Sequence, residues 1–288
     1  MTEDFVVNQL KTLSLLVLLS GLLVVAGRAL GGSQGAAWAT LLAVALNLGG
    51  WWFSDRLVLA TSSAVPLSPE EAPGVHDLLA QLAAREGMPM PAVYLIPEDA
   101  PNAFATGRDP AHAVVAVTEG LLRTLPPDAL RGVLAHELAH IRNRDTLAMA
   151  LAASLAAAIG FLADMARWGA LLGGGRGDED QPSPWAGLLL ALLLPFAALL
   201  VRMAVSRTRE FEADASAARM TGQPLALADA LARLEREAVR SPMAHVSPSS
   251  AHLYIVDPLR AGAWFENLFR THPPMDERIR RLERLATP

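Results

Sequence analysis

Long apolar runs alternate with mixed polar segments along this chain of 288 residues. The runs carry almost no charge, and their length of about 20 residues is what a helix needs to cross the hydrocarbon of a bilayer. They are Leu10–Leu30, Ala36–Phe53, Thr146–Ala166 and Trp185–Val205. Core helices of a soluble protein would show a polar face, which these runs barely do. The pattern therefore predicts four transmembrane helices in two pairs.

The first run has an alternative interpretation as a cleaved signal peptide, because Lys11 lies at its start. A retained helix is favoured, since the run is long for a signal peptide and a second run follows directly. Arginines near the ends of the runs are more frequent in residues 55–145 and 207–288 than in the two connecting loops. Because excess positive charge marks the cytoplasmic side, we expect these polar segments to face the cytoplasm.

The polar segments show the periodicities of a domain that combines helices with a few short strands. Helices are expected over Pro69–Gly87, over Glu119–Arg123, from Leu125 past Ile141, from Arg209 past Ala218, over Leu225–Arg240 and over Met275–Leu285. Strands are expected at Ala92–Ile96, Asn102–Gly107 and His112–Thr118. An edge strand of such a sheet could hold a peptide in extended form through main-chain hydrogen bonds.

The predicted fold class is mainly α with a small β-sheet, in an integral membrane protein with four transmembrane helices. We expect the first helix pair in residues 1–54 and the second in residues 146–206. Residues 55–145 and 207–288 would then form the two parts of one soluble domain.

The overall composition excludes several classes of function. The chain is 52% hydrophobic and its mean hydropathy is +0.30, which suits a membrane protein. Its net charge of −5 gives no basic field for binding nucleic acid. Because the chain has no cysteine, disulfides, thiolate metal ligands and a cysteine nucleophile are ruled out.

The candidate chemistry lies in an H-E-x-x-H pattern formed by His136, Glu137 and His140. Residues four apart lie on one face of a helix, so the two imidazoles can bind one metal ion. Zn²⁺ accepts neutral imidazole ligands, and three protein ligands leave a fourth position for water. Glu137 would then be the general base. The alternative is a pair of structural histidines.

A third metal ligand is expected from the segment that follows the fourth apolar run. Glu210 and Asp214 lie one turn apart on the predicted helix, and Glu210 would complete a His₂Glu site. Asp214 could accept the second N–H of a ligating imidazole and fix its tautomer. The alternative is that both residues are ordinary solvated acids.

Five blocks of this sequence resemble the HtpX family of membrane-bound zinc metalloproteases, which is related to the CAAX prenyl proteases of the gluzincin clan. The blocks are Asn102–Gly107, His136–His140, Ser206–Asp214, His252–Pro258 and Thr271–Arg278. They occur in the order and spacing of that family, and the resemblance as a whole covers nearly the whole chain. The resemblance implies a gluzincin-like protease domain in the inner membrane.

The resemblance also implies roles for particular residues. The metal ligands would be His136, His140 and Glu210, with Glu137 as the catalytic base and Asp214 as a supporting acid. The substrate-aligning edge would contain Asn102, Ala103, Phe104 and Ala105. His272 would lie in a loop near the active site, where it could act in catalysis, although it could equally cap the last helix.

The implied function is zinc-dependent hydrolysis of internal peptide bonds in misfolded or damaged membrane proteins, that is, quality control. The partners would be protein or peptide substrates and the lipid bilayer, with no nucleic acid. Two alternatives stay open: a site-specific processing peptidase acting on a membrane-presented substrate, and a non-catalytic zinc-binding scaffold or chaperone. The presence of Glu137 argues against the scaffold, because a purely structural zinc site does not need it.

Overall fold

The computed structural model describes residues 3–151, 158, 207–240, 243, 253–256 and 273–287. The chain divides into two compact units, Met1–Trp52 with Leu151–Ala204, and Phe53–Ala150 with Val205–Pro288. Nearly all of the expected second helix pair and the whole of its connecting loop lie outside the described residues. The described part of the chain is mainly helical with a four-stranded mixed sheet.

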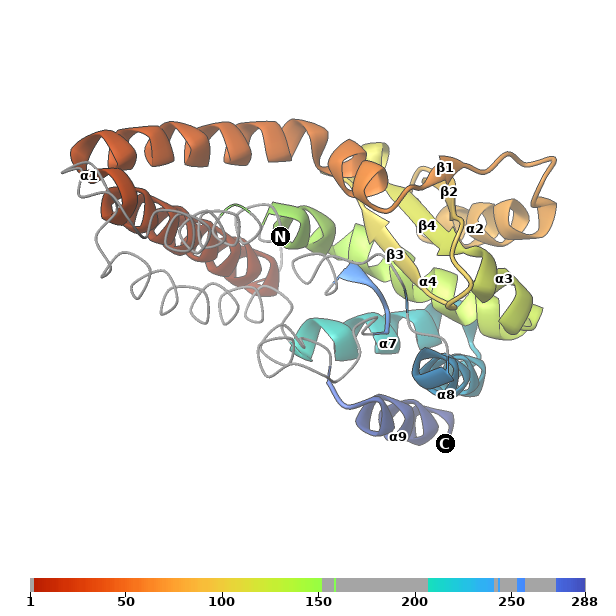
Figure 1. The fold of residues 1–288 in the computed structure, drawn as a ribbon. Coiled ribbons are helices and arrows are strands. Elements are labelled where there is room, and N and C mark those ends of the chain that lie inside the picture. The colour runs from red at the N-terminus through yellow and green to blue at the C-terminus, as the bar shows by residue number, and fades with distance from the viewer. Residues whose placement is uncertain are drawn as a thin grey trace. The chain divides into compact units, whose positions relative to one another are not determined.

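The first two apolar runs lie in one helical stretch, α1, which extends over Glu3–Thr61. Gly32 has a φ of 58°, and the side-chain amide of Asn47 donates to Ser20 Oγ at 3.0 Å. On a straight helix Ser20 and Asn47 would be about 40 Å apart, at 1.5 Å per residue. The stretch therefore reverses direction near Gly32, between the first two apolar runs, as Figure 1 shows.

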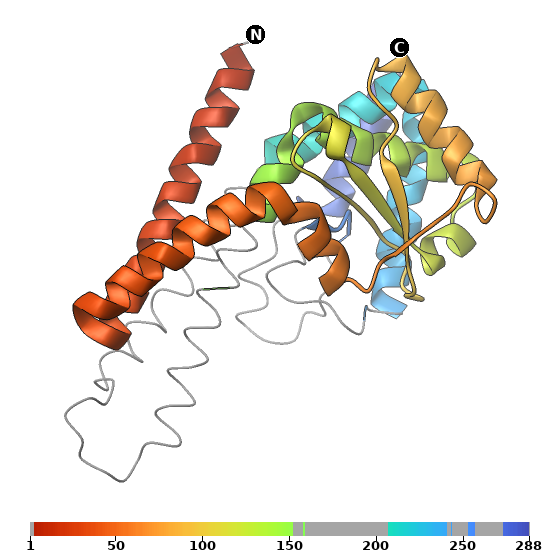
Figure 2. The same cartoon turned by 90° about the horizontal axis from the view of Figure 1, so that it is seen from above.

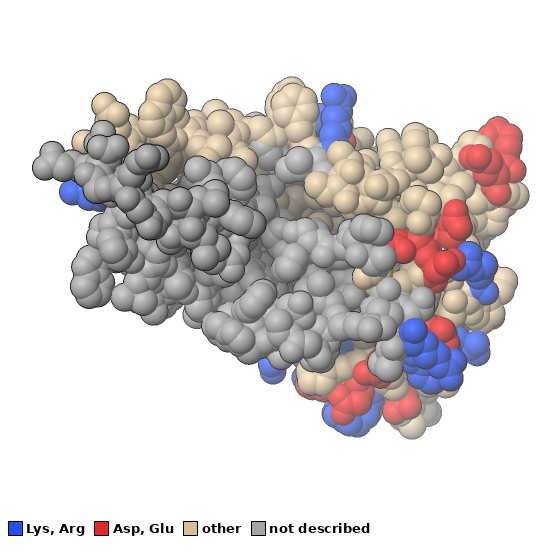
Figure 3. Space-filling model, in the orientation of Figure 1, with Lys and Arg blue, Asp and Glu red and all other residues tan. Residues whose placement is uncertain are grey.

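The two arms of α1 approach each other closely at glycines and present apolar side chains outward. A Cβ added to Gly35 would lie only 2.1 Å from the carbonyl oxygen of Gly27, so these positions need glycine. Leu13, Trp38 and Leu48 are each at least 60% exposed. Figure 3 shows this surface almost free of charged side chains. By length and composition, Leu16–Gly49 is able to cross a membrane.

The sheet of the second unit has the order β1-β2-β4-β3. Its strands are β1 Val65–Pro66, β2 Ala92–Ile96, β3 Ala103–Thr106 and β4 Val114–Thr118. Strands β2 and β4 are parallel, whereas β1 pairs antiparallel with β2 and β3 antiparallel with β4. The three expected strands are confirmed. β1 was not predicted, because two residues carry no periodic signal.

Together with the end of α1 and the 3₁₀-helix η1 at Pro110–His112, six α-helices accompany this sheet in the described part of the second unit (Figures 1 and 2). They are α2 Pro73–Arg85, α3 Glu119–Thr124, α4 Pro127–Asn143, α7 Arg207–Thr221, α8 Pro224–Arg240 and α9 Met275–Ala286. Helix α4 packs against α7 and α8, and its residues Leu134 and Leu138 are fully buried. A Cβ at Gly132 would lie 3.1 Å from the backbone of Leu227 in α8, so a glycine permits this close helix packing.

Edge strand β3 joins two hydrophobic clusters because its side chains alternate between the two faces of the sheet. Ala103 and Ala105 belong to the cluster that contains α4, whereas Phe104 belongs to the opposite cluster. The Phe104 ring packs edge-on against Tyr254 with centroids 5.2 Å apart. The segment Leu253–Val256 is therefore docked beside β3.

Gly120 in α3 gives the sharpest stability prediction for this unit. A Cβ at this position would lie 2.0 Å from the carbonyl oxygen of Asp99, so Gly120→Ala forces the backbone apart. We expect a loss of about 1–3 kcal/mol in the free energy of unfolding, the usual cost of overpacking. Thermal unfolding of Gly120→Ala measures this loss of stability. Gly74→Ala is the control, because a Cβ at Gly74 would have no other atom within 4 Å. Equal melting temperatures for the two variants would contradict this packing.

Candidate metal centre

Helix α4 positions the two histidines and the glutamate of the H-E-x-x-H pattern. The helix starts with Pro127, whose missing N–H costs nothing at a first-turn position. Its apolar side chains bury one face, and His136, Glu137 and His140 are themselves only 1%, 2% and 5% exposed. Three titratable groups on two consecutive turns are therefore held inside the domain, where the charged form of each group is costly without a partner.

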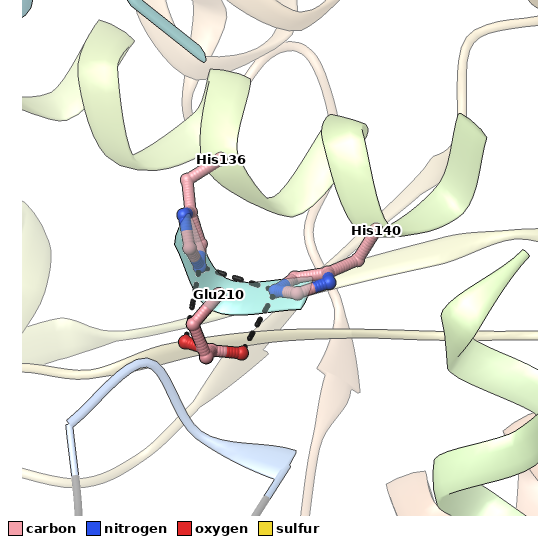
Figure 4. Close-up of side chains that lie close together, drawn as sticks. All are labelled: His136, His140 and Glu210. Atoms are coloured by element: carbon pink, nitrogen blue, oxygen red, sulfur yellow. Dashed lines mark hydrogen bonds and ion pairs between the residues drawn. The ribbon is translucent and has the colours of Figure 1, made fainter. Parts of the chain in front are cut away.

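Helix α7 brings Glu210 to these histidines from 70 residues further along the chain. The Glu210 carboxylate lies 3.4 Å from His140 Nε2 and 3.9 Å from His136 Nε2. The two Nε2 atoms are 3.2 Å apart. Figure 4 shows the three side chains pointing toward one another. The expected third ligand is thus close to the pair, and Glu212 is exposed.

Both imidazoles are oriented by carboxylates on their other nitrogen. His136 Nδ1 lies 2.9 Å from Asp214 Oδ1, and His140 Nδ1 lies 3.3 Å from Asp145 Oδ2. When each Nδ1 donates its hydrogen to a carboxylate, both Nε2 atoms of the neutral rings are acceptors. Two ring acceptors and a carboxylate then converge on one point, an arrangement that needs a cation.

The spacing of these atoms fits zinc. A tetrahedral Zn²⁺ with bonds of about 2.0–2.1 Å holds its ligand atoms about 3.3 Å apart. The two Nε2 atoms are 3.2 Å apart, His140 Nε2 lies 3.4 Å from one Glu210 oxygen, and His136 Nε2 lies 3.9 Å from the other. One ligand atom from each residue gives a set within 4.8 Å. The donor set of two imidazole nitrogens and one carboxylate is also one that zinc uses in catalytic sites. His136, His140 and Glu210 therefore can hold this metal ion with little rearrangement.

A fully buried arginine, Arg278 of α9, balances the acids of the site. Its Nε and Nη2 donate to the two oxygens of Asp214 at 2.8 and 2.7 Å, and Nη1 lies 3.4 Å from Glu210. Burial alone would raise the pKa of Asp214, but the charge and hydrogen bonds of Arg278 lower it to about 2. Asp214 is thus a permanent anion behind His136.

The two imidazoles experience opposite pKa shifts in the absence of metal. Burial, helped by the charge of Arg278, lowers the pKa of His136. Burial also acts to lower the pKa of His140, but hydrogen bonds to Asp145 and Glu210 outweigh it and raise this pKa well above its ordinary value. A ligating imidazole must be neutral, so a metal ion that bound here would have to displace a proton from His140.

Burial also raises the pKa of Glu137 to about 7. The backbone N–H of Ala105 in β3 donates to this carboxylate and moderates the shift. A cation bound at the neighbouring histidines would favour the carboxylate further. A carboxyl group with a pKa near 7 can exchange a proton at neutral pH, and Glu137 lies on the same helix as the two histidines.

The residues expected to align a substrate are buried in this structure, and much of the strand edge is already bonded. The Ala103 carbonyl accepts from the N–H of Ile255 at 3.0 Å. The Asn102 side chain brackets Val256, donating to its carbonyl at 2.8 Å and accepting from its N–H at 3.3 Å. In this state the segment Leu253–Val256 takes the place that an extended peptide would need at Ala103.

The remaining candidate, His272, lies outside the described residues, as do His245 and His252. His76 Nε2 lies 2.9 Å from the Leu67 carbonyl oxygen and His112 pairs with Asp109, and neither belongs to the converging group found among the described residues. Sequence reasoning missed Asp145 and Arg278, although Asp145 directly follows the helix of the motif and Arg278 closes the last block of the resemblance.

A pair of histidines on one helix, a carboxylate as the third candidate ligand and a buried glutamate beside an edge strand are together typical of a metallopeptidase. A family model described as Peptidase family M48 matches residues 69–286. This chain belongs to peptidase family M48.

Curated relatives match over nearly their whole length. The "Protease HtpX homolog" of Syntrophobacter fumaroxidans is 51% identical over 96% of this chain and 98% of its own. The protein of the same name from Acaryochloris marina is 50% identical over 96% of this chain and 94% of its own. Among solved structures, S. mikatae Ste24p aligns with 81% of this chain and 58% of its own, at 20% identity and a TM-score of 0.47.

Proposed function

We propose that this chain is a zinc-dependent endopeptidase in which His136, His140 and Glu210 bind the metal and Glu137 is the catalytic base. The observation that carries the proposal is the convergence of the three ligand atoms, all within 4.8 Å of one another, beside a buried glutamate on the same helix. Membership of a peptidase family supports it. Zn²⁺ is favoured over Mg²⁺ or Ca²⁺ because two of the ligands are imidazoles.

Different side chains of this protein have different roles in the proposed hydrolysis. When bound, zinc supplies a Lewis acid that polarises the scissile carbonyl and lowers the pKa of water. Glu137 accepts the proton of the attacking water and then delivers it to the leaving amine. Asp214 holds the His136 ring, and burial of the site keeps other water away.

We further propose that the edge formed by Asn102, Ala103, Phe104 and Ala105 aligns the peptide. The Ala105 N–H reaches Glu137, so a peptide along β3 would pass beside the base. In this state the N–H of Ile255 donates to the Ala103 carbonyl. The segment Leu253–Val256 must therefore separate from β3 before a peptide can pair with that carbonyl. The part taken by His272 is left to experiment.

The proposed substrates are membrane proteins, cut at internal bonds on the cytoplasmic side in quality control. The apolar hairpin of α1 and the four apolar runs support an anchored, multi-pass enzyme with its two protease segments in one domain. The excess of arginine near the protease segments supports the cytoplasmic orientation. The relatives' name, "Protease HtpX homolog", agrees with this class of enzyme.

A processing peptidase with one cleavage site is the alternative, and product identification separates the two. The purified protein in liposomes is incubated with destabilised membrane proteins, and the fragments are identified by mass spectrometry. Quality control predicts many internal cuts whose number rises when the substrate is unfolded. A single cut near one terminus, insensitive to unfolding, would overturn this substrate class in favour of processing.

A further inference from the structure

The second metal-ligand candidate, His140, is supported by a chain of buried charged groups that has no assigned role. Its Nδ1 lies 3.3 Å from Asp145 Oδ2, and the other Asp145 oxygen lies 3.3 Å from Nε of Arg209. Asp145 and Arg209 are only 3% and 7% exposed. Burying these two charges is costly unless they are paired, so this arrangement requires an explanation.

The backbone places Asp145 at His140 through an uncommon turn. Helix α4 is capped by Arg144, which has a left-handed φ of 59°, a conformation that non-glycine residues rarely adopt. This turn lets the next side chain fold back onto the last turn of the helix. Thr146 then bonds the Gly107 carbonyl at 2.8 Å, tying the segment to the end of the edge strand. Asp145 is therefore held from both sides.

The same arrangement occurs at the other histidine. His136 Nδ1 faces Asp214, which in turn binds Arg278. Each candidate ligand imidazole thus has on Nδ1 a carboxylate that is paired with a guanidinium. At His136 the Nη2 of Arg278 also lies 3.4 Å from Nδ1 and 3.5 Å from Nε2 of the ring itself. The two networks of charged groups come from different elements. Asp145 follows the end of α4 and Arg209 lies at the start of α7, whereas Asp214 lies in α7 and Arg278 in α9.

We propose that Asp145 and Arg209 are positioning residues that fix the tautomer of His140, an inference that rests on the proposed metal site. The Asp145 carboxylate can only accept, so the neutral His140 ring carries its hydrogen on Nδ1 and keeps Nε2 free for the metal. Arg209 can only donate. Arg209 therefore holds the Asp145 carboxylate in place and determines which side-chain atom of residue 145 lies next to the guanidinium.

This arrangement makes a specific prediction for an amide at position 145. In Asp145→Asn the carbonyl oxygen must face Arg209, because an NH₂ group cannot accept from a guanidinium. The NH₂ group then faces His140 Nδ1 and forces the hydrogen onto Nε2, the metal-binding atom. Removing the guanidinium in Asp145→Asn/Arg209→Met frees the amide to turn, so that its oxygen again accepts from Nδ1.

Zinc affinity of the full-length, detergent-purified protein tests this inference by competition with a chromophoric chelator. We expect Asp145→Asn to weaken zinc binding about 10–100-fold, the usual effect of losing an outer partner of a ligand. The double variant should bind zinc more tightly than Asp145→Asn. If Asp145 and Arg209 had only a structural role, the losses of zinc affinity caused by the two substitutions would add in the double variant. The control is Asp229→Asn, which removes an exposed carboxylate paired with Arg233 at 2.8 Å and should leave affinity unchanged.

Two results would overturn the proposal: zinc binding by Asp145→Asn within twofold of wild type, or a double variant that binds zinc no more tightly than Asp145→Asn. Should the variants fail to fold, ¹⁵N-histidine spectra of the zinc-loaded wild type decide. They should show His140 with hydrogen on Nδ1 and metal on Nε2, and the reverse assignment refutes the proposal. Wild type that binds no zinc refutes the proposed function itself, whereas a zinc-binding wild type with an unaffected Asp145→Asn refutes only this inference.

Discussion

The variant Glu137→Gln is expected to bind zinc as wild type does and to lose peptide hydrolysis by at least about 10²–10⁴-fold, the contribution of a general acid–base group. Glutamine fills the same buried space and can still accept from the Ala105 N–H, but it cannot take a proton. Glu137 is not among the three converging ligand groups, so the metal site should persist. Initial rates with a fluorescence-quenched casein and metal analysis of the same sample measure both quantities.

The matched control for this variant is Glu212→Gln. Glu212 is an exposed acid in α7, two residues from Glu210, and it makes no contribution to the proposed mechanism. Its rate should equal that of wild type. The assignment of the base fails should Glu137→Gln keep more than a tenth of the wild-type kcat/KM.

The second large effect is expected for Glu210→Gln, which should lose the metal and, with it, all activity. The amide removes the only negative charge among the three converging ligands, while Arg278 remains buried 3.4 Å from that position. We expect zinc affinity to fall by more than the roughly 100-fold that loss of an outer partner costs. Zinc per chain after dialysis, together with thermal unfolding in excess zinc, reports the loss.

The two variants make a crossed test of the site. Glu137→Gln should carry zinc without cleaving, whereas Glu210→Gln should do neither. Retention of one zinc per chain by Glu210→Gln would remove this residue from the ligand set and leave the third ligand to be found elsewhere. Glu212→Gln again serves as the control, since it changes an acid on the same helix.

Features that repeat along the sequence could be predicted, and features that depend on a single distant contact could not. The helical spacing of apolar residues around His136 predicts α4, and short, largely apolar runs predict β2, β3 and β4. Strand β1 has only two residues and forms because it pairs with β2. The reversal of α1 has a local signal, since the glycine-rich residues 31–35 separate the first two apolar runs, although the helical backbone continues through them.

The candidate site shows the same contrast between local pattern and distant contact. Residue spacing alone places His136 and His140 on one helix face, but it left Glu210 equally consistent with a solvated acid. The structure brings Glu210 to the pair through the packing of α7 on α4. Asp145 and Arg278 have no spacing signal, because their roles depend on an unusual backbone turn and on the docking of α9.

Metal removal and return in the wild-type protein test the central claim most directly. Cleavage of casein by the detergent-purified enzyme is measured before chelation, after chelation and during titration with zinc. The account predicts that chelation reduces cleavage to background and that activity returns in full at one zinc per chain. Full cleavage by the chelated, metal-free enzyme would contradict the account, as would zinc binding at that stoichiometry with no return of activity.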